Sequence, residues 1–301
     1  MNSRYHLNNT RHNTEYYKLI FKSSFIVCCL VIGTLAAKEQ SSKFNPPSDY
    51  KDPCYATEEC YSVPVGSEQV ETLRLKPYHA IWTQHKPENG KMIKSPGSFE
   101  EILTRSENGQ WLHVQKTRMR NGMVKIETSI LDHATWQYLS LTITYENGPD
   151  NIPAQVFYDL TKDDYTAKVI LKDGSVKSGK TRTKSLAMFN GQIGGLAMAT
   201  LPLKEGYVAT LPMIIPNLGT FWIEATVVAK KTIPTADGAN QEVWEVNANW
   251  LNLSVGEIYE PGRDGDGGVY YIAVNPGNGV PPVIEYVNDG AVIAWDGVRR
   301  K

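Results

Sequence analysis

Apolar and polar residues alternate along many short segments of the chain after residue 110. The clearest segment is 138–145, in which leucine, isoleucine and tyrosine are separated by single serine and threonine residues. A two-residue period of this kind places one set of side chains on each face of a β-strand. Related patterns predict further strands at 111–117, 123–130, 154–158, 165–171, 175–183, 207–213, 220–229, 242–250, 269–274, 283–287 and 291–295.

Turn dipeptides separate these segments. Asn121-Gly122 and Asp173-Gly174 each lie between two alternating runs, and such pairs favour tight hairpins. Long helical periodicity is nearly absent, and only the segment 186–203, rich in Gly, Ala and Met, predicts a short helix or a packed loop. Many short strands with turns about every 10 residues predict a mostly β protein, built as an antiparallel sandwich or barrel.

The first 37 residues have the features of a targeting segment. Basic residues occur up to Lys22, and the uncharged stretch 25–37 follows. About 13 apolar or small residues suit the core of a signal peptide and fall short of the roughly 20 that span a membrane comfortably. We therefore expect residues 1–37 to be a signal peptide cleaved near Ala36 or Ala37, and the protein to be exported. The alternative is an uncleaved anchor over residues 19–37, which Lys22 interrupts.

The stretch 38–67 is predicted to be a flexible lead-in, because it is rich in Ser and Pro and its apolar residues follow no period. Two cysteines, Cys54 and Cys60, lie in it. An even number of cysteines in an exported chain favours a disulfide between them, with two free thiols as the alternative. The remaining residues, 68–301, are predicted to form a single β-rich domain.

Composition and charge exclude some classes of partner. The formal net charge is -1, so no basic excess indicates a nucleic acid partner. The histidines are scattered, and two cysteines alone do not make a zinc site. We therefore predict no catalytic residues, no metal site and no cofactor from the sequence.

Residues 174–181 match the phosphate-binding loop pattern G-x-x-x-x-G-K-[ST] in full, with Lys180 and Thr181 at its end. A functional loop of this type opens a helix, whose N-terminus supplies part of the anion site. Here the following residues have no helical preference, and Asp173-Gly174 is typical of a hairpin turn. The segment is therefore predicted to be a turn and a returning strand, with no nucleotide partner.

Several motifs between residues 111 and 295 resemble a bacterial periplasmic family of unknown function. They are Lys-Thr-Arg at 116–118, the hairpin at 171–179, the segment 197–207, Tyr270-Tyr271 and the segment 281–286. The resemblance implies a lipoprotein-carrier-like fold: a curved antiparallel sheet or incomplete barrel with one or two short helices near its mouth. It also implies a periplasmic location, and it supplies no catalytic residues.

A curved sheet of this type can enclose an apolar cavity. Met188, Phe189, Leu196 and Met198 are then candidates for an adaptable lid over a lipid or another apolar small molecule. A filled core without a cavity is the alternative for these residues. The same fold could also serve as a structural component that binds another envelope protein, or as an enzyme whose groups meet only in space.

Overall fold

The computed structural model describes residues 60–119, 121–161, 164–182, 189–216, 219–235, 239–251, 266–277, 279–288 and 290–297. All of them belong to one compact unit, Gln40–Lys301. The described strands are β1 (Cys60–Ser62), β2 (Tyr78–Glu88), β3 (Lys91–Arg105), β4 (Trp111–Arg118), β5 (Val124–Leu131), β6 (Tyr138–Glu146), β7 (Gln155–Asp159), β8 (Asp164–Ile170), β9 (Val176–Arg182), β10 (Phe189–Asn190), β11 (Val208–Ile215), β12 (Gly219–Pro234), β13 (Asn240–Leu251), β14 (Asp266–Ala273), β15 (Val283–Asn288) and β16 (Ala291–Trp295). The helical elements are the α-helix α2 (Gly194–Ala199) and the 3-10 turns η2 (Thr72–Arg74) and η3 (Gly191–Ile193).

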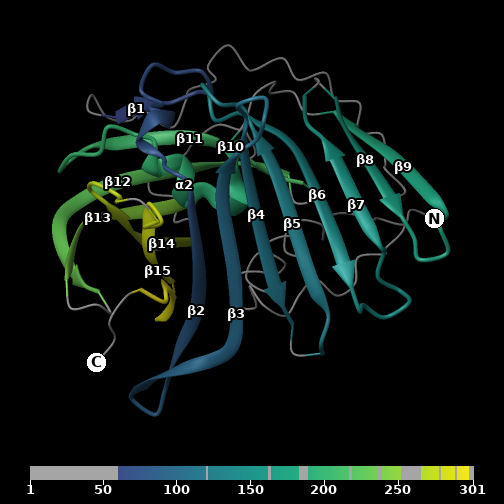
Figure 1. Ribbon diagram of the computed structural model, residues 1–301. Coiled ribbons are helices and arrows are strands. Elements are labelled where there is room, and N and C mark those ends of the chain that lie inside the picture. The colour runs from purple at the N-terminus through teal and green to yellow at the C-terminus, as the bar shows by residue number, and fades with distance from the viewer. Residues whose placement is uncertain are drawn as a thin grey trace, which may run out of the picture. The chain divides into compact units, whose positions relative to one another are not determined.

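All of these strands lie in one open sheet (Figure 1). Strands β2 to β9 form one antiparallel meander, and strands β11 to β16 form a second. The two meanders join where β16 pairs antiparallel with β2, with Trp295 opposite Trp82. The prediction of a mostly β protein with a curved antiparallel sheet that does not close, and with a short helix, is confirmed.

The edge of β11 that faces away from β12 is covered by two short parallel strands. Cys60 of β1 pairs with Val208, and Phe189 of β10 pairs with Met213 further along. Val63, directly after β1, is completely buried. The end of the predicted flexible lead-in is therefore part of the sheet, because the free edge of β11 supplies hydrogen-bonding partners that the local sequence does not reveal.

Two predictions about the N-terminal part concern residues outside the described ones. They are the signal peptide over residues 1–37 and the disulfide, because Cys54 and the side chain of Cys60 are not described. Both stay predictions. Among the residues that the structure describes, no helix has the length and apolar character of a membrane span.

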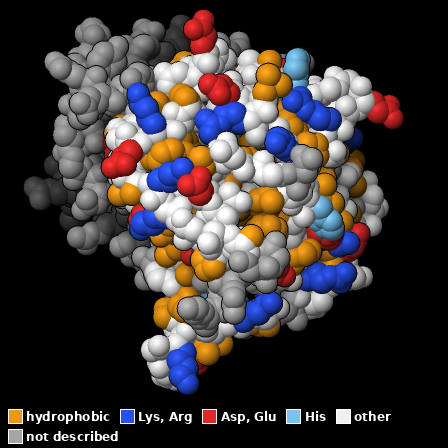
Figure 2. Space-filling view, turned by 60° about the vertical axis from the view of Figure 1, so that its left-hand side comes forward, with side chains coloured by type: hydrophobic (Ala, Val, Ile, Leu, Met, Phe, Trp, Pro, Cys, Tyr) orange, Lys and Arg blue, Asp and Glu red, His pale blue; other side chains and the backbone are white. Residues whose placement is uncertain are grey.

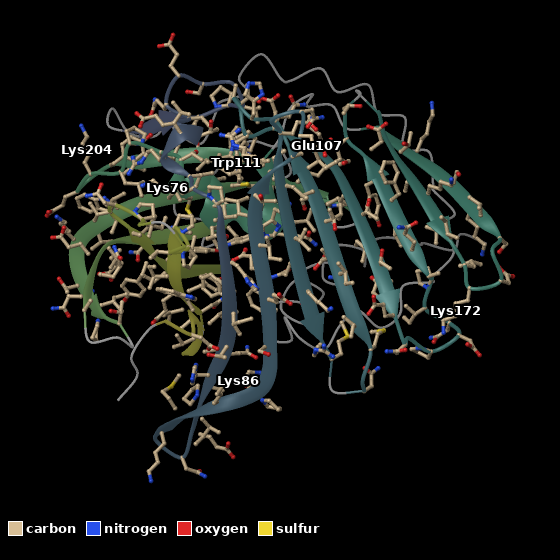
Figure 3. The ribbon with its side chains drawn as sticks, in the orientation of Figure 1. Lys76, Lys86, Glu107, Trp111, Lys172 and Lys204 are labelled. Carbon is tan, nitrogen blue, oxygen red and sulfur yellow. The ribbon has the colours of Figure 1, made fainter. Side chains whose placement is uncertain are left out.

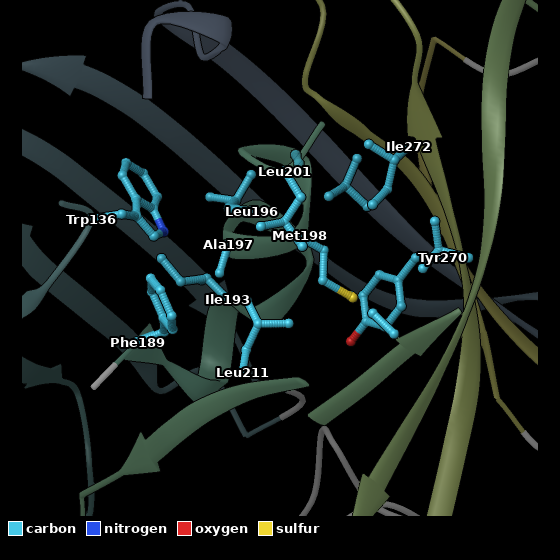
Figure 4. Packing of buried hydrophobic residues seen from close by; sticks show 14 of the residues in the cluster. Trp136, Phe189, Ile193, Leu196, Ala197, Met198, Leu201, Leu211, Tyr270 and Ile272 are labelled. Carbon is cyan, nitrogen blue, oxygen red and sulfur yellow. The ribbon is translucent and has the colours of Figure 1, made fainter. Parts of the chain in front are cut away.

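Helix α2 fills the space inside the curl of the sheet, and all six of its residues are buried. Close packing needs small residues here: a Cβ atom on Gly195 would lie 2.9 Å from the ring of Tyr270 and 3.0 Å from Val283. Figure 4 shows the helix side chains Leu196 and Met198 among the residues of the main core. The expected short helix in the segment 186–203 is thus confirmed, and it forms part of the core.

The phosphate-loop pattern lies in the hairpin of β8 and β9. Gly174 has a φ of 81°, and the backbone N–H of Ser175 donates to the carboxylate of Asp173. Lys180 and Thr181 lie within β9, where they pair with Thr166 and Tyr165. The predicted hairpin is confirmed, and the pattern does not open a helix.

Strands β2 and β3 have no counterpart among the predicted strands. They form a long hairpin that extends beyond the rest of the sheet at the bottom of Figure 1. Asn89 and Gly90 form its turn, with φ values of 51° and 74°. Left-handed conformations at both central residues are typical of the tight type I′ turn, for which Asn-Gly is the preferred sequence.

Candidate functional site

Polar side chains occupy neighbouring positions on the inner face of the sheet, the face toward α2. Glu101 of β3 pairs with Gln115 of β4, which pairs with Glu127 of β5. His113 pairs with Ser129, and these two lie two residues away from Gln115 and Glu127 on β4 and β5. Because residues directly opposite each other share a face of the sheet, these five residues form a polar row across three strands.

One end of the polar row is a buried carboxylate with two hydrogen-bond partners. The Oε1 atom of Glu101 lies 2.7 Å from Nε2 of His113, and the indole N–H of Trp82 donates to Oε2 at 2.7 Å. Glu101 and His113 are only 6% and 2% exposed. A buried charge is tolerated only when it is paired, so this arrangement holds the side chains of β2, β3 and β4 in fixed positions.

Tyr78 lies beside this carboxylate. Burial, reinforced by the negative charge of Glu101, raises the pKa of the Tyr78 phenol well above its ordinary value. The hydroxyl therefore keeps its proton across the physiological range. It can act as a hydrogen-bond donor there, and its environment gives it no tendency to become an anion.

The other end of the polar row connects β5 with the segment that leads into α2. Glu127 accepts from the ammonium group of Lys125 at 2.8 Å and from the amide of Gln192 at 3.2 Å. Asn190 donates to the hydroxyl of Ser129 at 3.1 Å, and its carbonyl oxygen accepts from the backbone N–H of Gln192. These contacts anchor η3 to the inner face of β5.

Beyond Glu127 the inner face becomes apolar. Glu127 is paired with Ile143 of β6, Ile143 with Val156 of β7, and Val156 with Val169 of β8. We call Ile143, Val156 and Val169 the apolar strip. The first two are buried in a satellite cluster that also contains Ile214, and Val169 is half-buried at the margin of that cluster. A single row of the sheet therefore runs from an ion pair to apolar side chains.

The predicted lid residues lie elsewhere, in the main core. Phe189 is in β10, and Leu196 and Met198 are on α2; all three are buried and belong to one cluster with Trp136 and Tyr270 (Figure 4). Met188 lies outside the described residues. The packing matches the alternative of a filled core at these positions, and contact of these side chains with a ligand stays a prediction.

Sequence reasoning missed the polar row. Lys125, Glu127 and Ser129 alternate along a predicted strand, and this pattern was a usable sign of a polar patch on one face. Glu101 could not be found, because β3 itself was not predicted. In the described part of the chain, no three His, Cys, Asp or Glu side chains gather closely enough to hold a metal ion.

Comparisons with known proteins support no family assignment. No protein-family model matches the chain, and no curated protein matches its sequence significantly. One solved structure whose backbone is partly similar is that of a β-barrel-like protein of domain of unknown function DUF1849 from Brucella abortus. It is 9% identical, with a TM-score of 0.42 over 75% of this chain and 97% of that one.

Proposed function

We propose that the protein is an exported binding protein that holds an amphiphilic, lipid-like molecule on the inner face of its sheet. The apolar part of the molecule would lie along the apolar strip, toward β8. Its polar group would meet the ion pair of Lys125 and Glu127. Export is proposed from the N-terminal segment 1–37, and a periplasmic location from the family resemblance.

The change of polarity along one row of the sheet is the observation that carries this proposal. Ligand sites are mostly apolar surfaces with a few well-placed polar groups that orient the ligand. Here Glu127 and Val169 lie in one row, with Ile143 and Val156 between them. The helix α2 contacts β10, β14 and β15, whereas the apolar strip lies on β6, β7 and β8.

The orientation of the ligand follows from the charges. The side chain of Lys125 is 17% exposed and that of Glu127 is 8% exposed, so the lysine is the more accessible of the two side chains. An anionic head group would therefore be bound by Lys125, with the amide of Gln192 nearby as a further donor. Lipid-like molecules with an acidic head group are the class that fits.

Native mass spectrometry of the purified full chain, followed by organic extraction, tests the proposal. Val169→Asn places an amide on the apolar strip, whereas Ile170→Asn makes the same change on the outer face of the same strand. Both side chains are half-buried, so the two variants are matched in exposure. We expect a co-purifying lipid-sized mass that Val169→Asn reduces several-fold and Ile170→Asn retains. A chain without bound ligand, or an equal loss in both variants, would contradict the proposal.

A further inference from the structure

The hairpin of β2 and β3 projects beyond its neighbouring strands. Pairing of β16 with β2 reaches His85, and pairing of β4 with β3 begins at Phe99. The register of β2 and β3 shifts between Thr83 and His85, so residues 95–97 bulge opposite Gln84. Residues 86–94 therefore form a two-stranded ribbon that pairs with neither β16 nor β4, and we call it the hairpin tip (Figure 1).

The hairpin tip combines exposed apolar and basic side chains. Met92 and Ile93 are 44% and 45% exposed. Lys86, Lys91 and Lys94 are also exposed, with Glu88 as the one acidic residue of the tip. The formal charge of the whole chain is -1, so the tip is locally positive on a nearly neutral protein. Figure 2 shows basic and apolar side chains side by side on the lobe at its lower end, and Figure 3 labels Lys86 on the tip.

The two apolar side chains point in opposite directions. Successive residues of a strand lie on opposite faces, so Met92 and Ile93 each occupy one face of the ribbon. Lys86 is directly opposite Ile93, and Lys94 lies two residues from Met92 on its face. Each face of the tip thus carries one large apolar side chain with a lysine beside it.

We infer that the hairpin tip docks on the surface of a bilayer that contains anionic lipids. A flat protein surface would cover one face of the ribbon and leave the other apolar side chain in water. The headgroup region surrounds an inserted tip, so it can bury Met92 and Ile93 together while the lysine stems reach the lipid phosphates. This inference does not depend on whether the inner face binds a ligand.

The backbone of the tip also favours a two-stranded ribbon without a third paired strand. The type I′ turn at Asn89 and Gly90 matches the natural twist of two strands. Pro87 lacks a backbone N–H and removes one donor from the ribbon, which disfavours the addition of a further strand from a partner protein. Glu88 is directly opposite Lys91, so its charge is offset within the tip.

Hydrogen exchange of the full chain with and without vesicles tests the inference. The vesicles contain phosphatidylcholine alone or phosphatidylcholine with phosphatidylglycerol. Exchange over residues 86–94 reports on the tip itself, even where residues 25–37 also hold the chain on the vesicle. We expect slower exchange of the tip with anionic vesicles and little change with neutral ones. Added salt should reverse the effect, because screening weakens attraction between exposed charges.

A matched pair of double variants tests whether vesicle binding depends on this hairpin or on any exposed apolar and basic pair. Ile93→Ser with Lys94→Gln alters the tip, and Val176→Ser with Lys177→Gln makes the same kind of change in the β8–β9 hairpin, where both residues are exposed. Each lysine near an anionic surface strengthens binding about fivefold, and a buried apolar side chain adds to this. We expect the first variant to reduce vesicle protection of the tip at least about tenfold and the second to leave it unchanged. Equal losses, or no protection of residues 86–94 by anionic vesicles, would overturn the inference.

Discussion

Glu100 and Glu101 are adjacent residues of β3, and each binds a histidine, but on opposite faces of the sheet. The outer pair, Glu100 with His79, spans 2.8 Å between side chains that are 37% and 59% exposed. The inner pair, Glu101 with His113, spans 2.7 Å between side chains that are 8% and 2% exposed. The same chemistry therefore occurs once in water and once in the protein interior, which gives a controlled comparison.

Replacing Glu101 with leucine should destabilise the protein by about 3 kcal/mol, because His113 and the indole of Trp82 lose their buried acceptor. Replacing Glu100 with leucine should change the free energy of unfolding by less than about 1 kcal/mol, as is usual for exposed ion pairs. Urea unfolding of the two variants measures both values. Equal effects would show that burial does not set the strength of the inner pair.

The double variant Glu101→Leu with His113→Leu extends this test. Removing both partners leaves no unpaired histidine, so the loss of stability should be smaller than the sum of the two single losses by about 1 kcal/mol or more. A strictly additive result would mean that the two side chains do not stabilise each other.

Gly195→Ala should destabilise the protein by about 1–3 kcal/mol, although alanine is the better helix former. The added Cβ would lie 2.9 Å from the ring of Tyr270, and the ring is held in the core. Gly179→Ala in β9 is the control, because nothing lies within 4 Å of its added Cβ, and it should be neutral or slightly stabilising. Thermal unfolding compares the two, and equal midpoints would contradict the close packing of α2.

Three buried tyrosines should resist ionisation. Burial raises the pKa of Tyr78, Tyr138 and Tyr270 well above the ordinary value, with Glu101, Glu127 and Tyr286 as respective neighbours that raise it further. A raised pKa in the folded state means that stability is fully present below about pH 10 and is lost as the pH rises above it. Ultraviolet titration should show these phenols ionising together with alkaline unfolding, and early ionisation of all tyrosines would contradict their burial.

Acid should weaken the turn between β5 and β6 through Asp132. Burial alone would raise the pKa of this carboxyl, but hydrogen bonds from Thr135 and Ala134, with His133 nearby, outweigh it and lower the pKa. A lowered pKa contributes stability above about pH 4 that is lost as the pH falls. Asp132→Asn should therefore be less stable than the parent protein at neutral pH by about 1 kcal/mol, with the difference disappearing in acid.

The control for this prediction is Asp150→Asn, because the carboxylate of Asp150 is exposed and pairs only at 3.4 Å with Lys172. Urea unfolding of both variants across the acid range provides the measurement. A difference for Asp132→Asn that is independent of pH would show that the ionised carboxylate is not the stabilising form.

Much of the sheet could be predicted because most strands of both meanders carry their own signal. Strand β6 alternates apolar and polar residues along most of its length. The turn dipeptide Asp173-Gly174 predicts the hairpin of β8 and β9. Strands β2 and β3 were not predicted, because their charged residues and Pro87 interrupt the alternation of apolar and polar residues. Asn89-Gly90 is nevertheless a clear turn signal between them.

The candidate site was harder to predict because it depends on neighbours across strands. Glu101, Gln115 and Glu127 are separated by more than ten residues each, and only the register of β3, β4 and β5 brings them into one row. The predicted lid residues Phe189, Leu196 and Met198 lie in the main core and not in this row. Small and apolar residues such as those of α2 suit a packed core as well as a binding surface, and the sequence does not distinguish the two.

The pairing of β16 with β2 has a consequence for synthesis of the chain. Trp82 leaves the ribosome roughly 200 residues before Trp295, the residue that it faces in the finished sheet. Throughout that interval the edge of β2 lacks its partner strand, and an unpaired edge is a template for association with other chains. Chains truncated before β16 should therefore exchange strands or aggregate, and the last strand made is the one that protects the first long strand.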